Sequence, residues 1–182
     1  SFRGDFSLSL SLFTKLKQTT TMIQTTFNVP ALFAKEHNTG LSEKYNFISS
    51  ENIMNILGDY AWHPREANYV RSKKNSDPTY KRHCVRFSPQ EDIEALAGCN
   101  TKTVGDAWPE IVMYNSHDGT SALTLTGGLF RLVCSNGMTV KEESFGEIRL
   151  RHDNLALKFP NYLETTLRNF GEEVQSFVGD KI

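Results

Sequence analysis

The stretch PEIVMYNSHDGTSALTLTGGLFRLVCSNGMTV, residues 109–140, decides the fold class. Apolar and polar residues alternate on both sides of a short polar turn, which is typical of two antiparallel strands. Asp118-Gly119 lies in that turn and favours a tight hairpin. The pair Gly127-Gly128 interrupts the second run, so it predicts either a β-bulge or a tight turn into a further strand.

The turn also contains a hydroxyl, an imidazole and a carboxylate, within Asn115, Ser116, His117, Asp118 and Gly119. A Ser-His-Asp group works only when its three side chains converge, whereas neighbouring residues on a strand point apart. We therefore interpret the motif as a structural turn whose Asn and Asp side chains bond the backbone. The contacts that His117 makes across the fold stay open, and His83 and His152 are the first candidates.

The remaining periodicity completes the fold class. Alternation predicts strands over 45–49, 67–72, 80–88 and part of 138–153. Helices are predicted over 49–58, with Ser49 or Ser50 as N-cap and Gly58 at its end; over 88–98, with Ser88 as N-cap and Pro89 as its first residue; and after Pro160. The sequence thus predicts an α+β fold, an antiparallel β-meander with two or three helices packed on one side.

The composition bounds the class of protein. The chain has 182 residues, 38% hydrophobic and 23% charged, as expected of an ordinary folded domain. We assign residues 1–21, which are rich in Ser, Thr, Leu and Lys, to a leader or disordered extension, and 22–182 to a single domain. The three cysteines form no C-x-x-C pair, and no apolar run has the length of a membrane span. We therefore expect a cytoplasmic protein with no membrane contact.

Charge is distributed unevenly along the chain. The net charge is −1, but residues 65–86 contain seven basic and two acidic residues, giving +5. Such a strip is either a solvated surface loop or a surface for a polyanion. The residues that would bind nucleic acid, through phosphate contacts or stacking, are Tyr69, Arg71, Lys73, Lys74, Tyr80, Lys81, Arg82 and Arg86.

Catalysis and metal binding have weaker support. His117, Asp118 and His152 are the candidates for a catalytic site, and His83 and Asp153 extend them into a minor hypothesis of a metal group. No metal-ligand spacing joins these residues, and isolated histidines usually satisfy local hydrogen bonds. We therefore predict no metal or cofactor, and the sequence does not favour an enzyme.

The long motif resembles the phage- and plasmid-borne proteins grouped as domain of unknown function 932. Members share "PEI…NSHDGSS", "G-[LI]-F-R-x-V-C-x-N-G" and "FG-x-[IV]-R-x-x-H". The matching positions here are Pro109 to Ile111, Asn115 to Gly119, Ser121, Gly128 to Arg131, Val133-Cys134, Asn136-Gly137, Phe145-Gly146, Arg149 and His152. Members usually have glycine after the histidine, where Asp153-Asn154 stand here. They are also usually longer at the C-terminus, which implies a short member or one lacking its C-terminal part.

The family has no established activity to carry over. The resemblance implies a mobile-element protein in a bacterial cytoplasm, concerned with DNA metabolism or host takeover. Together with the basic strip, it favours a nucleic-acid-binding accessory factor, of the single-strand-annealing kind, that can assemble with copies of itself. The alternatives are a module that binds a host defence protein and a metal-dependent nuclease.

Overall fold

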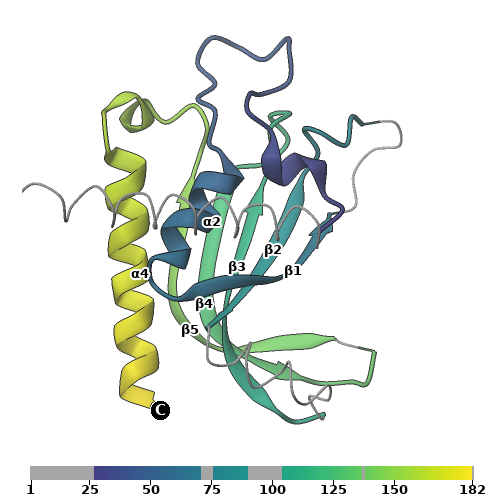
Figure 1. The fold of residues 1–182 in the computed structure, drawn as a ribbon, viewed down its shortest axis with the longest axis vertical. Coiled ribbons are helices and arrows are strands. Elements are labelled where there is room, and N and C mark those ends of the chain that lie inside the picture. Colours follow the sequence, from purple (N-terminus) through teal and green to yellow (C-terminus); the bar gives the residue numbers. More distant parts are fainter. Residues whose placement is uncertain (1–26, 71–75, 90–103, 137, 182) are drawn as a thin grey trace, which may run out of the picture.

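The computed structural model describes residues 27–70, 76–89, 104–136 and 138–181 (Figure 1). Five strands form one sheet in the order β1-β2-β3-β4-β5, and every neighbouring pair is antiparallel. The elements in chain order are η1 (Pro30–Phe33), α2 (Ser50–Gly58), β1 (Trp62–Tyr69), β2 (His83–Pro89), β3 (Ala107–Asn115), β4 (Leu123–Leu132), β5 (Thr139–Leu150), η2 (Leu155–Lys158) and α4 (Tyr162–Lys181). The predicted α+β meander is confirmed.

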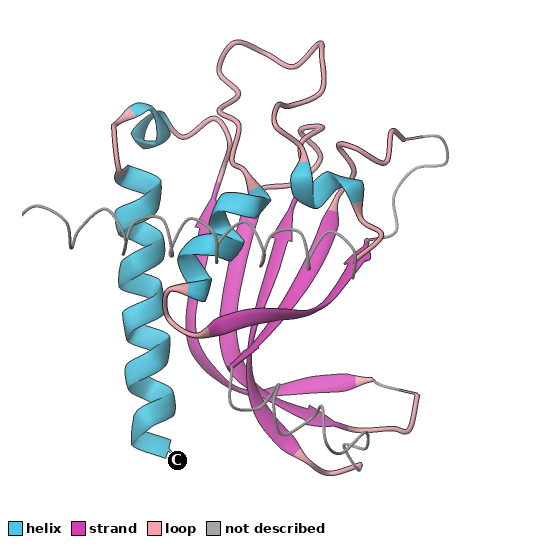
Figure 2. Cartoon of the chain, viewed as in Figure 1, coloured by secondary structure: helices cyan, strands magenta, loops and turns pink. Residues whose placement is uncertain are grey.

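The helices α2 and α4 lie against one face of this sheet, and the far ends of β4 and β5 curl away from it (Figure 2). Alternate residues of the strands face the helices, as the two-residue period requires. The buried cluster on this side includes Val85, Phe87, Ile111, Met113, Leu125, Leu167, Phe170 and Val174. It fixes which face of each strand is covered, so the intervening residues occupy the opposite face.

The sequence signals for α2 are confirmed. Ser49 is the N-cap, and its hydroxyl accepts a hydrogen bond from the Asn52 N–H at 3.2 Å. Glu51 lies in the first turn, where its charge suits the positive end of the helix dipole. Ile53 and Leu57 are fully buried, and the last helical residue is Gly58.

The two glycines of β4 lie opposite a bulge in β5 rather than in a turn. The pairing register with β5 shifts between Gly127 and Gly128, while β4 continues to Leu132. A Cβ at Gly128 would lie 2.5 Å from the backbone oxygen of Glu143, so no side chain fits there. One at Gly127 would lie 2.8 Å from Cγ2 of Val174 on α4. The glycines therefore allow β5 and α4 to approach closely.

Some element predictions are wrong. Residues 45–49 form no strand, because the Asn46 N–H donates to the His152 carbonyl beyond the end of β5, at 2.7 Å. Ser88 and Pro89 do not begin a helix, because they are the last residues of β2 and pair with β1. The rest of that predicted helix, and the extension 1–21, lie outside the described residues.

None of the helices in the described ranges combines the length and apolar character needed to cross a membrane.

Candidate functional site

The motif of residues 115–119 lies where β3 ends, and Asn115 anchors it to the helix layer. This fully buried side chain donates from Nδ2 to the Ile48 carbonyl and to the Ser50 hydroxyl, both at 3.0 Å. Its Oδ1 accepts from the Ser116 N–H at 2.9 Å. The amide nitrogen thus joins β3 to the start of α2, while the amide oxygen fixes the first residue of the turn.

The rest of the motif shapes the turn. The Ser116 hydroxyl accepts from the Ser121 N–H at 3.1 Å, across the turn. The Asp118 carboxylate accepts from the N–H and the hydroxyl of Thr120, at 3.0 and 2.5 Å. Gly119 has φ +76°, a left-handed conformation that favours glycine. The structural-turn interpretation therefore explains these residues, and Ser116, His117 and Asp118 form no triad.

His117 contacts His83, one of its two predicted neighbours. The ring centroids lie 5.3 Å apart, and both side chains are fully buried. Nε2 of His117 lies 2.9 Å from the Ala31 carbonyl in η1. A carbonyl only accepts, so this nitrogen carries the proton and Nδ1 presents a lone pair. That Nδ1 is buried and has no hydrogen-bond partner among the described residues.

His83 belongs to a directed chain of hydrogen bonds. Its Nδ1 donates to the Lys81 carbonyl at 2.9 Å, which leaves Nε2 to accept from the Ser50 hydroxyl at 2.7 Å. Ser50 in turn accepts from Asn115. Every side-chain polar group in this network of His83, Ser50 and Asn115 has a hydrogen-bond partner. A buried polar network stabilises a fold when all of its groups are satisfied in this way.

The surroundings hold these imidazoles neutral. Burial lowers the pKa of His83 to about 4. Burial, followed by the proximity of His83 and His152, lowers the pKa of His117 to about 4. Burial also lowers the pKa of His152, whose Nδ1 donates to the Asn46 carbonyl at 3.0 Å. At neutral pH the three rings are uncharged acceptors rather than proton donors to a substrate.

The catalytic candidates are only partly brought together. His152 lies near enough to His117 to oppose a positive charge on its ring, but Asp118 uses its carboxylate within the turn. Asp153 forms an exposed ion pair with Arg151 at 2.9 Å. In the part of the chain that the structure describes, no group of three or more His, Cys, Asp or Glu residues could hold a metal ion.

A cleft of about 290 Å³ opens beside His152, at the same end of the sheet. It is lined by Leu41, Ser42, Tyr45, Gly119, Ser121, Ala122, Arg151, His152 and Asp153. Tyr45 stacks on His152 with ring centroids 4.5 Å apart, and its hydroxyl donates to the Ser116 carbonyl at 3.0 Å. The cleft is therefore built from three chain segments that the turn motif holds together.

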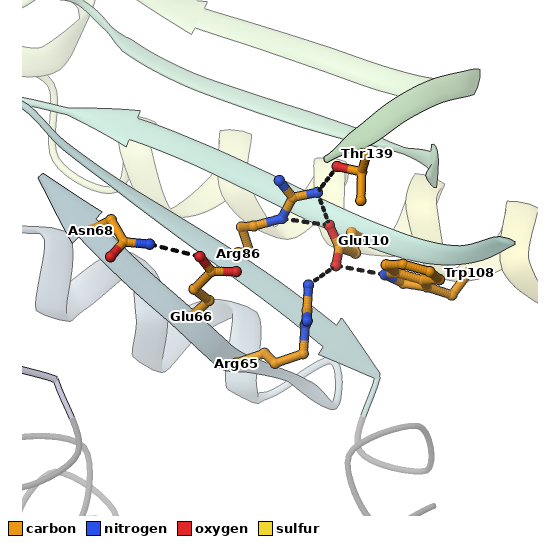
Figure 3. Close-up of polar contacts among 7 residues, drawn as sticks. All are labelled: Arg65, Glu66, Asn68, Arg86, Trp108, Glu110 and Thr139. Carbon is orange, nitrogen blue, oxygen red and sulfur yellow. Dashed lines mark hydrogen bonds and ion pairs between the residues drawn. The ribbon is translucent and has the colours of Figure 1, made fainter. Parts of the chain in front are cut away.

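Glu110 on β3 faces the side of the sheet opposite the helices, and sequence reasoning missed it. Its fully buried carboxylate accepts from Trp108 Nε1 at 2.6 Å and from Arg86 Nε at 2.8 Å, and it pairs with Arg65 (Figure 3). Arg86 also donates to the Thr139 hydroxyl on β5, at 2.9 Å. The available signal was the single acidic residue in the largely apolar run of β3, with one arginine each on β1 and β2.

The Glu110 cluster changes the interpretation of the basic strip. Arg86 is committed to Glu110 and lies over the Phe130 ring, with its guanidinium carbon 5.2 Å from the ring centroid. The Arg82 guanidinium lies over the Tyr114 ring, also at 5.2 Å, and the Lys81 ammonium lies over Tyr69 at 5.5 Å.

Three other candidates of the strip, Arg71, Lys73 and Lys74, lie outside the described residues. Tyr80 is half-buried, and its carbonyl accepts from the His117 N–H at 2.9 Å. The nucleic-acid contacts of the strip therefore stay a prediction.

The remaining motif residues hold the end of the β4–β5 hairpin. Arg131 makes a two-point ion pair with Glu142 on β5, at 2.5 and 2.9 Å. Asn136 Oδ1 accepts from the Met138 N–H at 3.3 Å. Gly137, the last of these motif residues, lies outside the described residues.

Comparison with known proteins identifies relatives for most of the chain. The family model "Domain of unknown function (DUF932)" matches residues 40–171. The UPF0380 proteins YafZ and YfjQ of Escherichia coli (strain K12) are 33% and 32% identical over 124 residues, or 68% of this chain and 41% of each relative. The chain thus spans about two fifths of the length of these relatives.

No solved structure shows a significant match to the chain. The family match covers the turn motif, the three buried histidines, the cleft and Glu110. The chain therefore belongs to the DUF932 family, whose function is unknown.

Proposed function

We propose that this protein binds nucleic acid through a basic corner made of Tyr69, Lys81, Arg82 and Tyr114. The observation that carries the proposal is the stacking of the Arg82 guanidinium on Tyr114 without a carboxylate partner among the described residues. Lys81 over Tyr69 of β1 is a second such pair at this end of the sheet, on the face that carries the helices.

The chemistry of the corner suits a single strand. A cation held over an aromatic ring keeps its full charge for a phosphate, whereas an ion pair with a carboxylate neutralises it. Proteins that bind single strands combine such cations with aromatic rings on which bases stack. Arg86 does not share this property, because the buried Glu110 holds it. We therefore exclude Arg86 from the proposed contact surface.

The resemblance to mobile-element proteins supports a place for this binding in DNA metabolism. Within the proposal, the protein is an accessory factor of a phage or plasmid that acts in the cytoplasm of a bacterial host. Annealing of complementary strands is the finer form of the same proposal, because a protein that holds bases unpaired on a stacking surface presents them for pairing.

The test is fluorescence anisotropy with a labelled single-stranded and a labelled double-stranded DNA at several salt concentrations. We expect tighter binding of the single strand. The variant Lys81→Gln/Arg82→Gln should bind at least about tenfold more weakly, because two phosphate contacts and their stacking are lost. In a plot of the logarithm of the binding constant against the logarithm of the salt concentration, the slope for this variant should be shallower by about 1.4.

The matched control is Lys158→Gln/Arg168→Gln, which changes the net charge equally at exposed or half-exposed positions of η2 and α4. It should bind as the unaltered protein does, and circular dichroism should show both variants folded. Salt-insensitive binding, or an equal loss in both double variants, would overturn the proposal. Annealing is measured separately, by energy transfer between complementary labelled strands.

A further inference from the structure

The cleft beside His152 contains two buried polar atoms whose hydrogen-bonding capacity is unused. Ser121 and His152 both line this cleft, and Ser121 Oγ and His152 Nε2 are buried without a hydrogen-bond partner among the described residues. A buried polar group without a partner costs about 1–3 kcal/mol. Two such atoms in one cleft therefore indicate a ligand that supplies the missing bonds.

The protonation of His152 defines what that ligand must offer. Its Nδ1 donates to the Asn46 carbonyl, so Nε2 presents a lone pair. Only 6% of the residue is exposed, and the stacked Tyr45 ring lies 4.5 Å away with an angle of 11° between the planes. The imidazole is therefore a fixed acceptor that calls for an N–H or O–H donor.

Ser121 supplies the complementary group. Its backbone N–H is bonded to the Ser116 hydroxyl at 3.1 Å, which fixes the residue while its own hydroxyl is left without a described partner. That hydroxyl can donate to a carbonyl oxygen. A ligand with an N–H donor beside a C=O acceptor, the edge of a lactam, satisfies both atoms.

Nucleobases present this edge. Thymine, uracil and guanine carry a ring N–H next to a ring carbonyl, whereas cytosine and adenine carry an unprotonated ring nitrogen at that position. The cleft adjoins the proposed corner through one turn, because Tyr80 bonds the backbone of His117 and Tyr45 bonds that of Ser116. A nucleic-acid strand bound to Lys81 and Arg82 would therefore reach the end of the β-sheet where the cleft lies.

We propose that the cleft binds the lactam edge of a thymine, uracil or guanine base, with the base N–H donating to His152 Nε2 and its carbonyl accepting from the Ser121 hydroxyl. The proposal rests on the proposed nucleic-acid binding and gives it a base preference. Arg151 lies at the rim of the cleft with its side chain 76% exposed, where it can meet the phosphate or the sugar of that nucleotide.

The first experiment uses free nucleosides and isothermal titration calorimetry. We expect binding of uridine and at least tenfold weaker binding of N3-methyluridine and cytidine, which lack the donor. Ser121→Ala should weaken uridine binding about tenfold without unfolding the protein, since this hydroxyl makes no hydrogen bond among the described residues. Ser144→Ala, on the exposed surface of β5, is the control and should bind as before.

The second experiment separates a free nucleoside from a base within a strand. Oligonucleotides of thymidine and of cytidine are compared by anisotropy, with Ser121→Ala and Lys81→Gln/Arg82→Gln. A preference for thymidine that Ser121→Ala removes supports the cleft as a site for strand bases. Equal binding of both oligonucleotides, unaffected by Ser121→Ala but lost in the double variant, overturns the base preference and leaves the proposed function intact.

Two outcomes remain, and each is decisive. Uridine binding that requires Ser121, with no binding of any oligonucleotide, supports the cleft as a free-nucleoside site and overturns the proposed function. Equal affinity for uridine and N3-methyluridine, or no uridine binding at millimolar concentration, overturns the lactam proposal. His152→Asn, which keeps a donor for Asn46 and removes the acceptor, should give the same loss as Ser121→Ala.

Discussion

Glu110 accepts from an indole and pairs with two guanidinium groups while its own side chain is wholly buried. Removing one partner of a buried ion pair typically costs about 3–5 kcal/mol, because the other charge is left without compensation. Arg65 and Arg86 keep 26% and 22% of their side chains exposed, so water recovers part of this loss. We expect Glu110→Gln to lower the free energy of unfolding by about 3 kcal/mol, measured by urea denaturation.

The control for this prediction is Glu142→Gln. It breaks an ion pair with Arg131 that lies at the surface, where water screens both charges. The control should therefore change the free energy of unfolding little. An equal cost for both variants would show that the Glu110 cluster contributes no more than a surface pair.

At the scale of elements, the packing of α4 on β4 depends on the absence of a side chain at Gly127. A Cβ there would lie 2.8 and 3.4 Å from the two Cγ atoms of Val174 and 3.6 Å from the Phe170 ring. Both α4 residues are buried and cannot move into solvent. We expect Gly127→Ala to destabilise the protein by about 1–3 kcal/mol through overpacking, measured by thermal and urea denaturation.

Gly58→Ala is the matched control, since a Cβ at this helix end has nothing within 4 Å. Alanine there should be neutral or should stabilise the protein slightly, because it restricts the unfolded chain more than glycine does. If Gly127→Ala were tolerated as well as Gly58→Ala, that result would contradict the close approach of α4 to β4.

The elements show which local signals suffice. The alternation around Asp118-Gly119 predicted β3 and β4, and the capping serine predicted the start of α2, because these signals act within a few residues. Residues 45–49 also alternate, but their backbone partner, His152, is more than a hundred positions away. Local pattern cannot tell an extended segment that borders a sheet from a strand within it.

Across the whole molecule, the candidate site escapes prediction because its parts are distant in sequence. The cleft joins Tyr45, Ser121 and His152, and the Glu110 cluster joins β1, β2 and β3. The sequence did single out His117 and name His83 as its neighbour, and the ring contact confirms that pair. It could not show that each ring donates to a backbone carbonyl, since the carbonyls belong to segments with no motif of their own.

Burial of His83 and His117 makes the stability of the entire fold sensitive to acid. His83 and His117 have a pKa of about 4 in the folded protein, lowered first by burial, against an ordinary value of about 6.5 when unfolded. Between these two values the unfolded chain binds more protons than the folded one. Stability is therefore complete above about pH 6.5 and falls as the pH drops toward 4.

The loss should reach on the order of 2–3 kcal/mol for each of the two histidines, if both remain neutral in the fold. Urea denaturation from pH 7.5 to 4.5 measures it as the slope of the free energy of unfolding against pH. His117→Gln should be less stable at pH 7.5, because the amide fills the buried space less well, yet it should lose less between pH 6.5 and 4.5. If the free energy of unfolding of His117→Gln had the same slope against pH as that of the unaltered protein, His117 would already be accessible to protons in the folded state. Only a ring that η1, β2 and the turn after β3 shield from solvent couples its titration to unfolding.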